Sequence, residues 1–341
     1  MFRNLLIYKL PAGWQASLAE LEAALAAVPF VECGSTQPVS MGWVSPRGVA
    51  HGAVVESVAG QFHAALQIEK KILPGSVVKR RLDELAAQVT KDSGRKPGKK
   101  HQRELKDQAM LELLPRAFTK RGQVRVWLAF EPGLLMIDAA SPAMASEVIT
   151  QLVQAFTGVT APGFNVLPLN TALSPAVLMR DWLASDEPPA IFGIDRECEL
   201  KSADEQKSVV RYARHALDTD EVKSHLEGGK TPTRLALTWN SRVSFTLTET
   251  SMLKKIEFLD VVMEGRAERE PSDQPGAHFD ADAAIATGEL EQLITDLIEA
   301  LGGEAEAAAP AVATSPAPGA ALDPAGGQAS ARPADEAPPW A

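Results

Sequence analysis

Residues 75–118 have the sequence GSVVKRRLDELAAQVTKDSGRKPGKKHQRELKDQAMLELLPRAF, and this stretch decides the fold that the sequence predicts. Apolar residues in the range Val77–Val89 recur at helical spacing, which predicts a basic amphipathic helix ending at Ser93-Gly94. Pro97 and Gly98 then force a break before a second helix over about residues 100–114. The stretch therefore predicts a helical hairpin with a lysine-rich end.

Strand patterns lie on both sides of this hairpin. Before it, residues 51–58 and 62–68 favour two strands that meet at Ala59-Gly60. After it, residues 124–130 and 134–137 favour another pair, joined by Glu131-Pro132-Gly133. The helical hairpin is thus expected to interrupt a sheet.

The rest of the chain alternates between the two patterns. Further helices are predicted at residues 18–28, 142–156, 172–183, 218–226 and 280–301, and further strands at 2–10, 209–212, 234–239, 243–247 and 253–258. We therefore expect an α+β fold with mixed sheets. The expected regions are a central one (1–74 and 122–170), the hairpin (75–121), a second α+β region (171–303) and a disordered Ala/Pro-rich tail (304–341).

Composition excludes several classes of protein. The chain has 341 residues, enough for two or three domains, with 45% hydrophobic and 23% charged residues, which is ordinary for a globular protein. It has no long apolar run, and Pro11 and Gly13 come too early for a signal peptide, so we expect a cytoplasmic protein. The two cysteines form no CxxC pair, which disfavours a disulfide framework and a structural zinc site.

Charge is distributed very unevenly. The net charge is −10 overall, yet residues 69–125 carry +9, against −1 in residues 1–68, −6 in 126–263 and −12 in 264–341. Because salt screens electric fields beyond about 10 Å, the positive charge of residues 69–125 affects a nearby polyanion more than the net charge of the whole chain does. An acidic protein can therefore still attract nucleic acid through this segment.

The basic block is concentrated at the end of the hairpin. Seven Lys and Arg residues fall between Lys91 and Lys106, and the candidate DNA contacts among them are Lys96, Lys99, Lys100 and Arg103. Such groups can bind phosphates without recognising bases. No aromatic residue lies in the run, which favours duplex over single-stranded nucleic acid. The alternative is an ordinary solvated, charge-rich helix pair.

No motif for catalysis, metal or cofactor is present. The sequence lacks GxxxxGK[ST], HExxH, GxSxG and GxGxxG, and no two histidines are spaced i, i+4. Asp280 and Asp282 fit the acidic start of a helix better than a metal site. We therefore expect no enzyme, no cofactor and no catalytic or metal-binding residue.

Several strings in order resemble the RdgC family of recombination-associated bacterial DNA-binding proteins. They are FRNLLIYKL (2–10), MGWV (41–44), EKKILP (69–74), LLPRAF (113–118), ELKS (199–202), LALTW (235–239), FDAD (279–282), TGEL (287–290) and LIEALGG (297–303). The tail after Glu304 is longer than the family's, and the resemblance implies nothing about its role.

The resemblance implies a protomer that pairs with a second copy at both ends, forming a ring-shaped homodimer that encircles duplex DNA. It further implies binding without sequence preference, association with the nucleoid, and restraint of the RecA recombinase, with direct contact to RecA left open.

The resemblance also implies residue roles. Phe118 matches the gate of the dimer, the contact where the tips of the two protomers meet and the ring can open, with an ordinary core phenylalanine as the alternative. Arg116 and Lys230 match basic positions facing the hole. Arg214 and His215 match a turn that points at DNA, although His215 stands where the family has an uncharged polar residue.

Two further expectations accompany these roles. Arg211, close to that turn, joins the DNA-binding candidates. The apolar stripe of the last helix, residues 280–301, is expected to pack at the second subunit contact, with the core of the same chain as the alternative.

Two functions of other classes stay open at this point. One is a metal-dependent DNA-processing enzyme, which the missing carboxylate cluster disfavours. The other is a protein-interaction scaffold whose basic hairpin meets an acidic partner.

Overall fold

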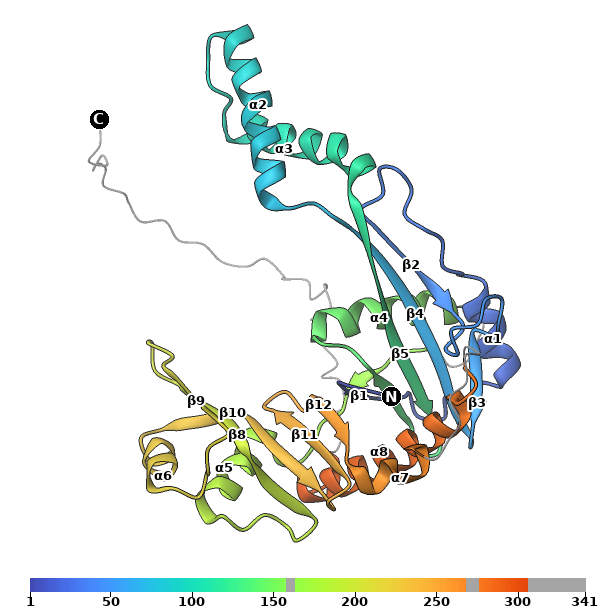
Figure 1. The fold of residues 1–341 in the computed structure, drawn as a ribbon, viewed down its shortest axis with the longest axis vertical. Helices are drawn as coiled ribbons and strands as arrows, with labels where there is room; N and C mark the ends of the chain where they lie inside the picture. The colour runs from blue at the N-terminus through green and yellow to red at the C-terminus, as the bar shows by residue number, and fades with distance from the viewer. Residues whose placement is uncertain (158–162, 268–275, 306–341) are drawn as a thin grey trace, which may run out of the picture. The chain divides into compact units, whose positions relative to one another are not determined.

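The computed structural model describes residues 1–157, 163–267 and 276–305, and it contains two antiparallel sheets with helices packed against them (Figure 1). Every strand pair in both sheets is antiparallel. The predicted α+β class is therefore confirmed. The expectation of mixed sheets is wrong, because short turns join successive strands, such as β3 (Val55–Val58) and β4 (Gln61–Ile72), into antiparallel hairpins.

The first sheet has seven strands in the order β2-β4-β5-β6-β1-β7, and β3 pairs with the remaining part of β4. Their bounds are β1 Leu6–Lys9, β2 Val39–Val44, β3 Val55–Val58, β4 Gln61–Ile72, β5 Phe118–Ala129, β6 Leu134–Ile137 and β7 Leu167–Pro168. The long strands β4 and β5 pair continuously from Phe62–Leu128 to Ile72–Phe118.

The helical hairpin is inserted between β4 and β5, as the sequence predicts. It consists of α2 (Gly75–Ser93) and α3 (Lys99–Leu113), followed by the short 3-10 helix η1 (Leu114–Arg116). Gly94 ends α2 with φ +67°, a conformation that favours glycine. In Figure 1 both helices stand beyond the ends of β4 and β5. The two helices share a small core of their own, formed by Leu85, Leu105 and Ala109.

The second sheet has five strands in the order β12-β11-β10-β8-β9. Their bounds are β8 Phe192–Ser202, β9 Val209–Ala213, β10 Lys230–Trp239, β11 Val243–Thr248 and β12 Leu253–Phe258. Backbone bonds between Leu5 and Leu253 link the start of the chain to β12. The two sheets are thus connected through the N-terminal residues.

Six helices outside the hairpin complete the described part of the chain. They are α1 Leu18–Ala26, α4 Pro142–Phe156, α5 Pro175–Ser185, α6 Asp220–Glu227, α7 Asp260–Ala267 and α8 Phe279–Ala300. A capping box of Ser17 and Glu20 begins α1, and the Ser141 side chain caps α4. Residues of α1 and α4 share one core with the first sheet. Residues of α5, α6 and α8 share another core with the second sheet.

The apolar stripe of α8 packs inside the same chain. Leu290, Leu293 and Leu297 are buried in a core that includes Trp127 of the first sheet and Trp239 of the second. Two polar contacts hold the helix to both sheets, because Asp296 accepts from the Trp239 indole at 2.8 Å and Glu291 accepts from Gln61 at 3.2 Å. The expectation that this stripe forms the subunit contact is therefore wrong, and its alternative is confirmed.

Two long strands were not predicted. β2 contains Gly42, where an added Cβ would lie 2.3 Å from the backbone of Phe30, so this strand needs a glycine where strands normally lack one. β8 mixes charged residues with Ile194, Cys198 and Leu200 and lacks clean alternation. β5 begins at Phe118, six residues before the predicted start at Val124. The sequence did not indicate this first part of the strand, because its six residues are exposed and carry no apolar pattern.

The predicted division into regions stays a prediction. Of the predicted tail, residues 306–341 lie outside the described residues. Glu304 and Ala305 are described, and both pair with the segment at Asn170 and Thr171.

Candidate nucleic-acid interface

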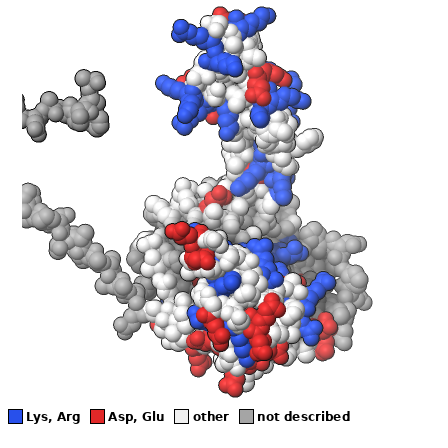
Figure 2. Space-filling view, turned by 90° about the vertical axis from the view of Figure 1, so that its left-hand side faces the viewer, with Lys and Arg blue, Asp and Glu red and all other residues white. Residues whose placement is uncertain are grey.

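The end of the helical hairpin carries the densest group of free cations. Lys96, Lys99, Lys100 and Arg103 are all exposed, and none forms an ion pair with any residue that the structure describes. Figure 2 shows Lys and Arg gathered over this part of the molecule. Since these side chains project from the turn after α2 and from the start of α3, their charges are available to an external polyanion.

The root of the hairpin holds Arg116 and Phe118. Arg116 is exposed in η1, and Phe118 opens β5 with 85% of its surface exposed. In the ladder Phe118 pairs with Ile72, which is 48% exposed. The alternative of a core phenylalanine is therefore wrong, because β5 here extends past the helices that cover the sheet.

A second group of candidates lies on the second sheet. Arg211 lines a cavity of about 420 Å³ together with Arg234 and Lys254. Arg214 lines a neighbouring hollow of about 660 Å³, which shares Lys255 with the first. Arg211 lies in the middle of β9 and Arg214 in the turn that directly follows this strand.

These sheet candidates differ in how free their charges are. Arg211 Nε donates to Glu199 at 2.6 Å. Burial opposes ionisation of Glu199, but bonds from Thr233 and Arg211 outweigh it and hold its pKa below the ordinary value. Lys230 Nζ lies 3.3 Å from the His225 ring, at the start of β10. Arg214 has no ion-pair partner among the described residues.

His215 is turned toward its own backbone. Its Nδ1 lies 2.6 Å from the carbonyl oxygen of Ala216, and its main-chain N–H donates to Arg196. The preceding Arg214 has φ +57°, a left-handed conformation that makes the turn tight. The structure thus brings Arg211, Arg214 and His215 together, whereas the hairpin candidates form a separate group.

Three basic residues of this face were missed from the sequence. Arg234, Lys254 and Lys255 line the same two hollows as the predicted arginines. The Lys254-Lys255 doublet inside a predicted strand was the available signal, since a strand with two consecutive lysines must expose at least one of them. Lys255 pairs with Glu197 at 2.6 Å, which leaves Lys254 as the freer charge.

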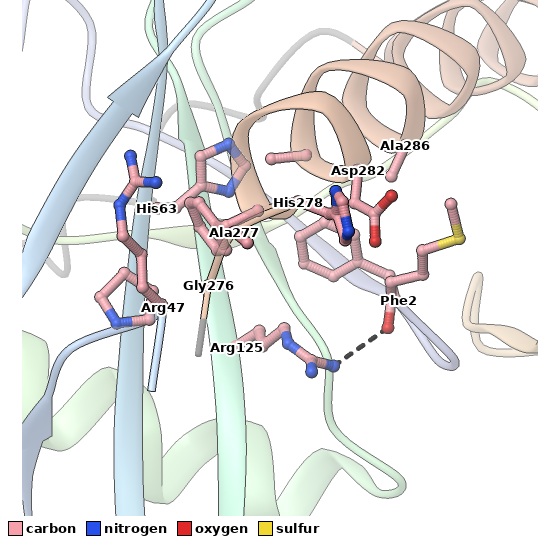
Figure 3. A pocket seen from close by; sticks show the side chains of 13 residues that line it. Phe2, Arg47, His63, Arg125, Gly276, Ala277, His278, Asp282 and Ala286 are labelled. Atoms are coloured by element: carbon pink, nitrogen blue, oxygen red, sulfur yellow. Dashed lines mark hydrogen bonds between the residues drawn. The ribbon is translucent and has the colours of Figure 1, made fainter. Parts of the chain in front are cut away.

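A different pocket, of about 370 Å³, lies where the start of α8 meets β4 and the N-terminal residues (Figure 3). Arg47 holds it together by pairing with Glu56 at 2.8 Å and with Asp280 at 2.6 Å. The Arg47 guanidinium also lies 5.0 Å from the centre of the Phe279 ring. These contacts fasten α8 to the first sheet and leave the pocket close to electrically balanced.

Within the described ranges, no group of three or more His, Cys, Asp or Glu side chains is placed to hold a metal ion. None of the described helices combines the length and apolar character needed to cross a membrane.

Comparison with known proteins identifies relatives over most of the chain. The family model described as "Putative exonuclease, RdgC" matches residues 1–304. A protein of Dechloromonas aromatica named "Recombination-associated protein RdgC" is 45% identical over 306 residues, covering 89% of this chain and 98% of that protein.

Two more proteins with the same name show similar coverage. The one from Cupriavidus pinatubonensis is 44% identical over 306 residues, covering 90% of this chain and 99% of its own. The one from a Janthinobacterium species is 41% identical over 308 residues, covering 89% of this chain and 99% of its own. This chain therefore belongs to the RdgC family of recombination-associated proteins.

Proposed function

We propose that this protein binds double-stranded DNA through its phosphates, without sequence preference, and restrains RecA-dependent recombination by occupying the duplex. The observation that carries the proposal is the group of four exposed cations at the end of the hairpin, which pair with no carboxylate in the described residues, in a member of a recombination-associated family. In the cell the protein would then lie on the nucleoid.

Free cations are the ones that contribute most to such binding. A lysine without a carboxylate partner releases condensed counterions from the DNA when it binds a phosphate. An arginine that is already ion-paired must first break its bond to the carboxylate. The hairpin residues, Arg116 and Arg214 therefore rank above Arg211, which is held by Glu199. Arg211 thus belongs to the proposed surface with a smaller expected effect. Lys230 has no carboxylate partner among the described residues, but it is half-buried and lies 3.3 Å from the His225 ring, so we rank it between the free cations and Arg211.

We further propose that two copies close into a ring around the duplex, with Phe118 at one of the two contacts. An exposed aromatic beside the half-exposed Ile72 is an apolar surface that a second copy can cover. The other contact belongs to surface residues of the second α+β region, since the α8 stripe is already buried.

The salt dependence of DNA affinity tests the binding surface. If about 5–8 phosphates are contacted, the log–log slope on duplex DNA should be roughly −5 to −7. Replacing Lys99, Lys100 and Arg103 by alanine should flatten it by up to about 3 units. Lys223→Ala on α6 removes one charge elsewhere and should leave it unchanged. An unaltered slope in the triple variant would place the binding surface elsewhere.

A metal-dependent nuclease is the second candidate, because the matching family model carries the word exonuclease in its description. Incubation with supercoiled and linear plasmid in magnesium or manganese separates the two functions. The proposal expects intact DNA. Shortening or nicking that EDTA abolishes would establish the nuclease instead.

A further inference from the structure

The outer edge of β5 is open along its first half. β5 pairs with β4 over its whole length, but on its other side β6 covers only Val126–Ala129. The last contact on that side is the Asp138 N–H donating to the Arg125 carbonyl at 2.9 Å. No described residue pairs with the edge from Thr119 to Val124.

The ladder geometry shows which main-chain groups point outward. In an antiparallel pair, residues alternate in the side to which they turn both N–H and C=O. Because Arg125 turns its carbonyl toward β6, Gln123, Arg121 and Thr119 turn theirs the same way. Every second residue of the open edge thus presents an unpaired N–H and C=O, and an added antiparallel strand could pair with these groups.

A pocket of about 470 Å³ adjoins this edge. Its apolar floor is formed by Ile68, Val124 and Met144, where the chain after β6 turns away into α4. Asp138 fixes that turn by accepting the N–H groups of the N-terminal segment, at 3.2 Å from Arg3 and 2.9 Å from Asn4. Arg121 and Gln123 of the open edge line the same pocket.

The rim of the pocket is basic. Lys120 and Arg3 make no ion pair with any residue in the described ranges, and Lys70 reaches Glu147 only at 3.8 Å. Among the described residues that line the pocket, Asp138 has the one carboxylate, which accepts from two backbone N–H groups and also pairs with Arg125 at 3.7 Å. The pocket therefore has an uncompensated positive charge.

We propose that this edge binds an extended, acidic peptide segment of a partner protein as an added strand. Backbone pairing would supply affinity, the apolar floor would take one alternate side chain, and carboxylates would meet Lys120, Arg3 and Lys70. This inference goes beyond DNA binding and does not depend on it.

Two features favour a peptide over DNA and over a second copy of this chain. DNA phosphates accept hydrogen bonds but donate none, so they cannot satisfy outward carbonyls, and they gain nothing from an apolar floor. A second copy of this edge would set like charges directly opposite each other, which destabilises strand pairing.

The test measures binding of a fluorescein-labelled short peptide that alternates valine and glutamate to the full-length protein, by anisotropy. Gln123→Pro removes one outward N–H while leaving the bonds to β4 in place, since proline is tolerated at a strand edge. It should weaken peptide binding about tenfold or more. Gln123→Ala keeps the N–H and should bind as the unmodified protein does. Lys120→Glu, which reverses a rim charge, should abolish binding at moderate salt.

The remaining measurements decide among the occupants. The Gln123→Pro protein should melt normally and keep its affinity for duplex DNA. Equal peptide affinity in the Pro and Ala variants would overturn strand addition. Loss of DNA affinity in Lys120→Glu, with no peptide binding by the unmodified protein, would assign the pocket to DNA and also overturn the proposal. Failure of DNA binding in every variant would reject the proposed function and leave the peptide result standing.

Discussion

A buried histidine makes the stability of this protein depend on pH at one residue. His63 on β4 is 5% exposed, and its Nε2 has no hydrogen-bond partner in the described structure. Burial lowers the pKa of His63 to about 4, against a weaker opposing effect of Glu56. The folded protein therefore holds this imidazole neutral at pH values where a free histidine is charged.

This predicts a loss of stability on mild acidification. Between the ordinary histidine pKa of about 6.5 and the folded value, the unfolded chain binds a proton that the folded chain does not, so stability falls as pH falls. The slope is at most about 1.4 kcal/mol per pH unit. Urea unfolding at pH 7, 6 and 5 should show a smaller pH dependence for His63→Leu than for the unmodified protein. Parallel curves for the two proteins would contradict the assignment.

For some single residues the sequence predicts the side-chain chemistry but not the surroundings of the side chain. The string LLPRAF left Phe118 open between core and surface, because its nearest strand neighbour, Ile72, precedes the whole helical hairpin. The pairing of Arg211 with Glu199 was equally hidden, since it depends on the register of β8 and β9. Residue types predicted the chemistry here, but only strand register determines which charges are free.

At the scale of elements, the hairpin is a separately packed unit. Leu85, Leu105 and Ala109 form its buried core, apart from the two larger cores. Its helices are therefore expected to open locally without unfolding of the sheets.

Leu105→Ala tests this separation. Removing a buried leucine costs about 2–5 kcal/mol, which is large for so small a core. Amide exchange should accelerate throughout α2 and α3 while β4 and β10 stay protected. Leu111→Ala, the same chemical change at a 55% exposed position of α3, should alter neither. Faster exchange across both sheets in Leu105→Ala would show that the hairpin is not independent.

Elements with strong periodicity were predicted well, and elements held by their neighbours were not. The two hairpin helices, α4 and α8 each have an apolar stripe or a clear start and stop, and the sequence placed them within a few residues. β2 and the first half of β5 lack such a signal, because pairing with β4 stabilises them rather than their own side chains.

For the whole molecule, ring closure is the main untested proposal. Phe118 is 85% exposed, so Phe118→Ala should leave the melting temperature unchanged. If the residue anchors a subunit contact, its truncation should weaken that contact by roughly 2–4 kcal/mol. Retention on closed circular duplex under a salt challenge should then fall, while retention on linear duplex changes little. Val31→Ala, at another exposed apolar residue, is the matched control.

Two outcomes would contradict parts of this proposal. Equal retention of Phe118→Ala and the unmodified protein on circles would remove Phe118 from any closing contact. Equal retention of the unmodified protein on circular and linear duplex would show that it does not encircle the DNA at all.

The length of the β4–β5 ladder determines how far the hairpin stands from the rest of the sheet. Each residue adds about 3.4 Å, and side chains alternate between faces, so adding one residue to both strands would turn every later side chain to the wrong face. Adding two residues to each strand avoids this and moves the hairpin by about 7 Å. The span between hairpin and sheet can therefore change only in discrete steps of that size, and any opening it borders would be sized in the same increments.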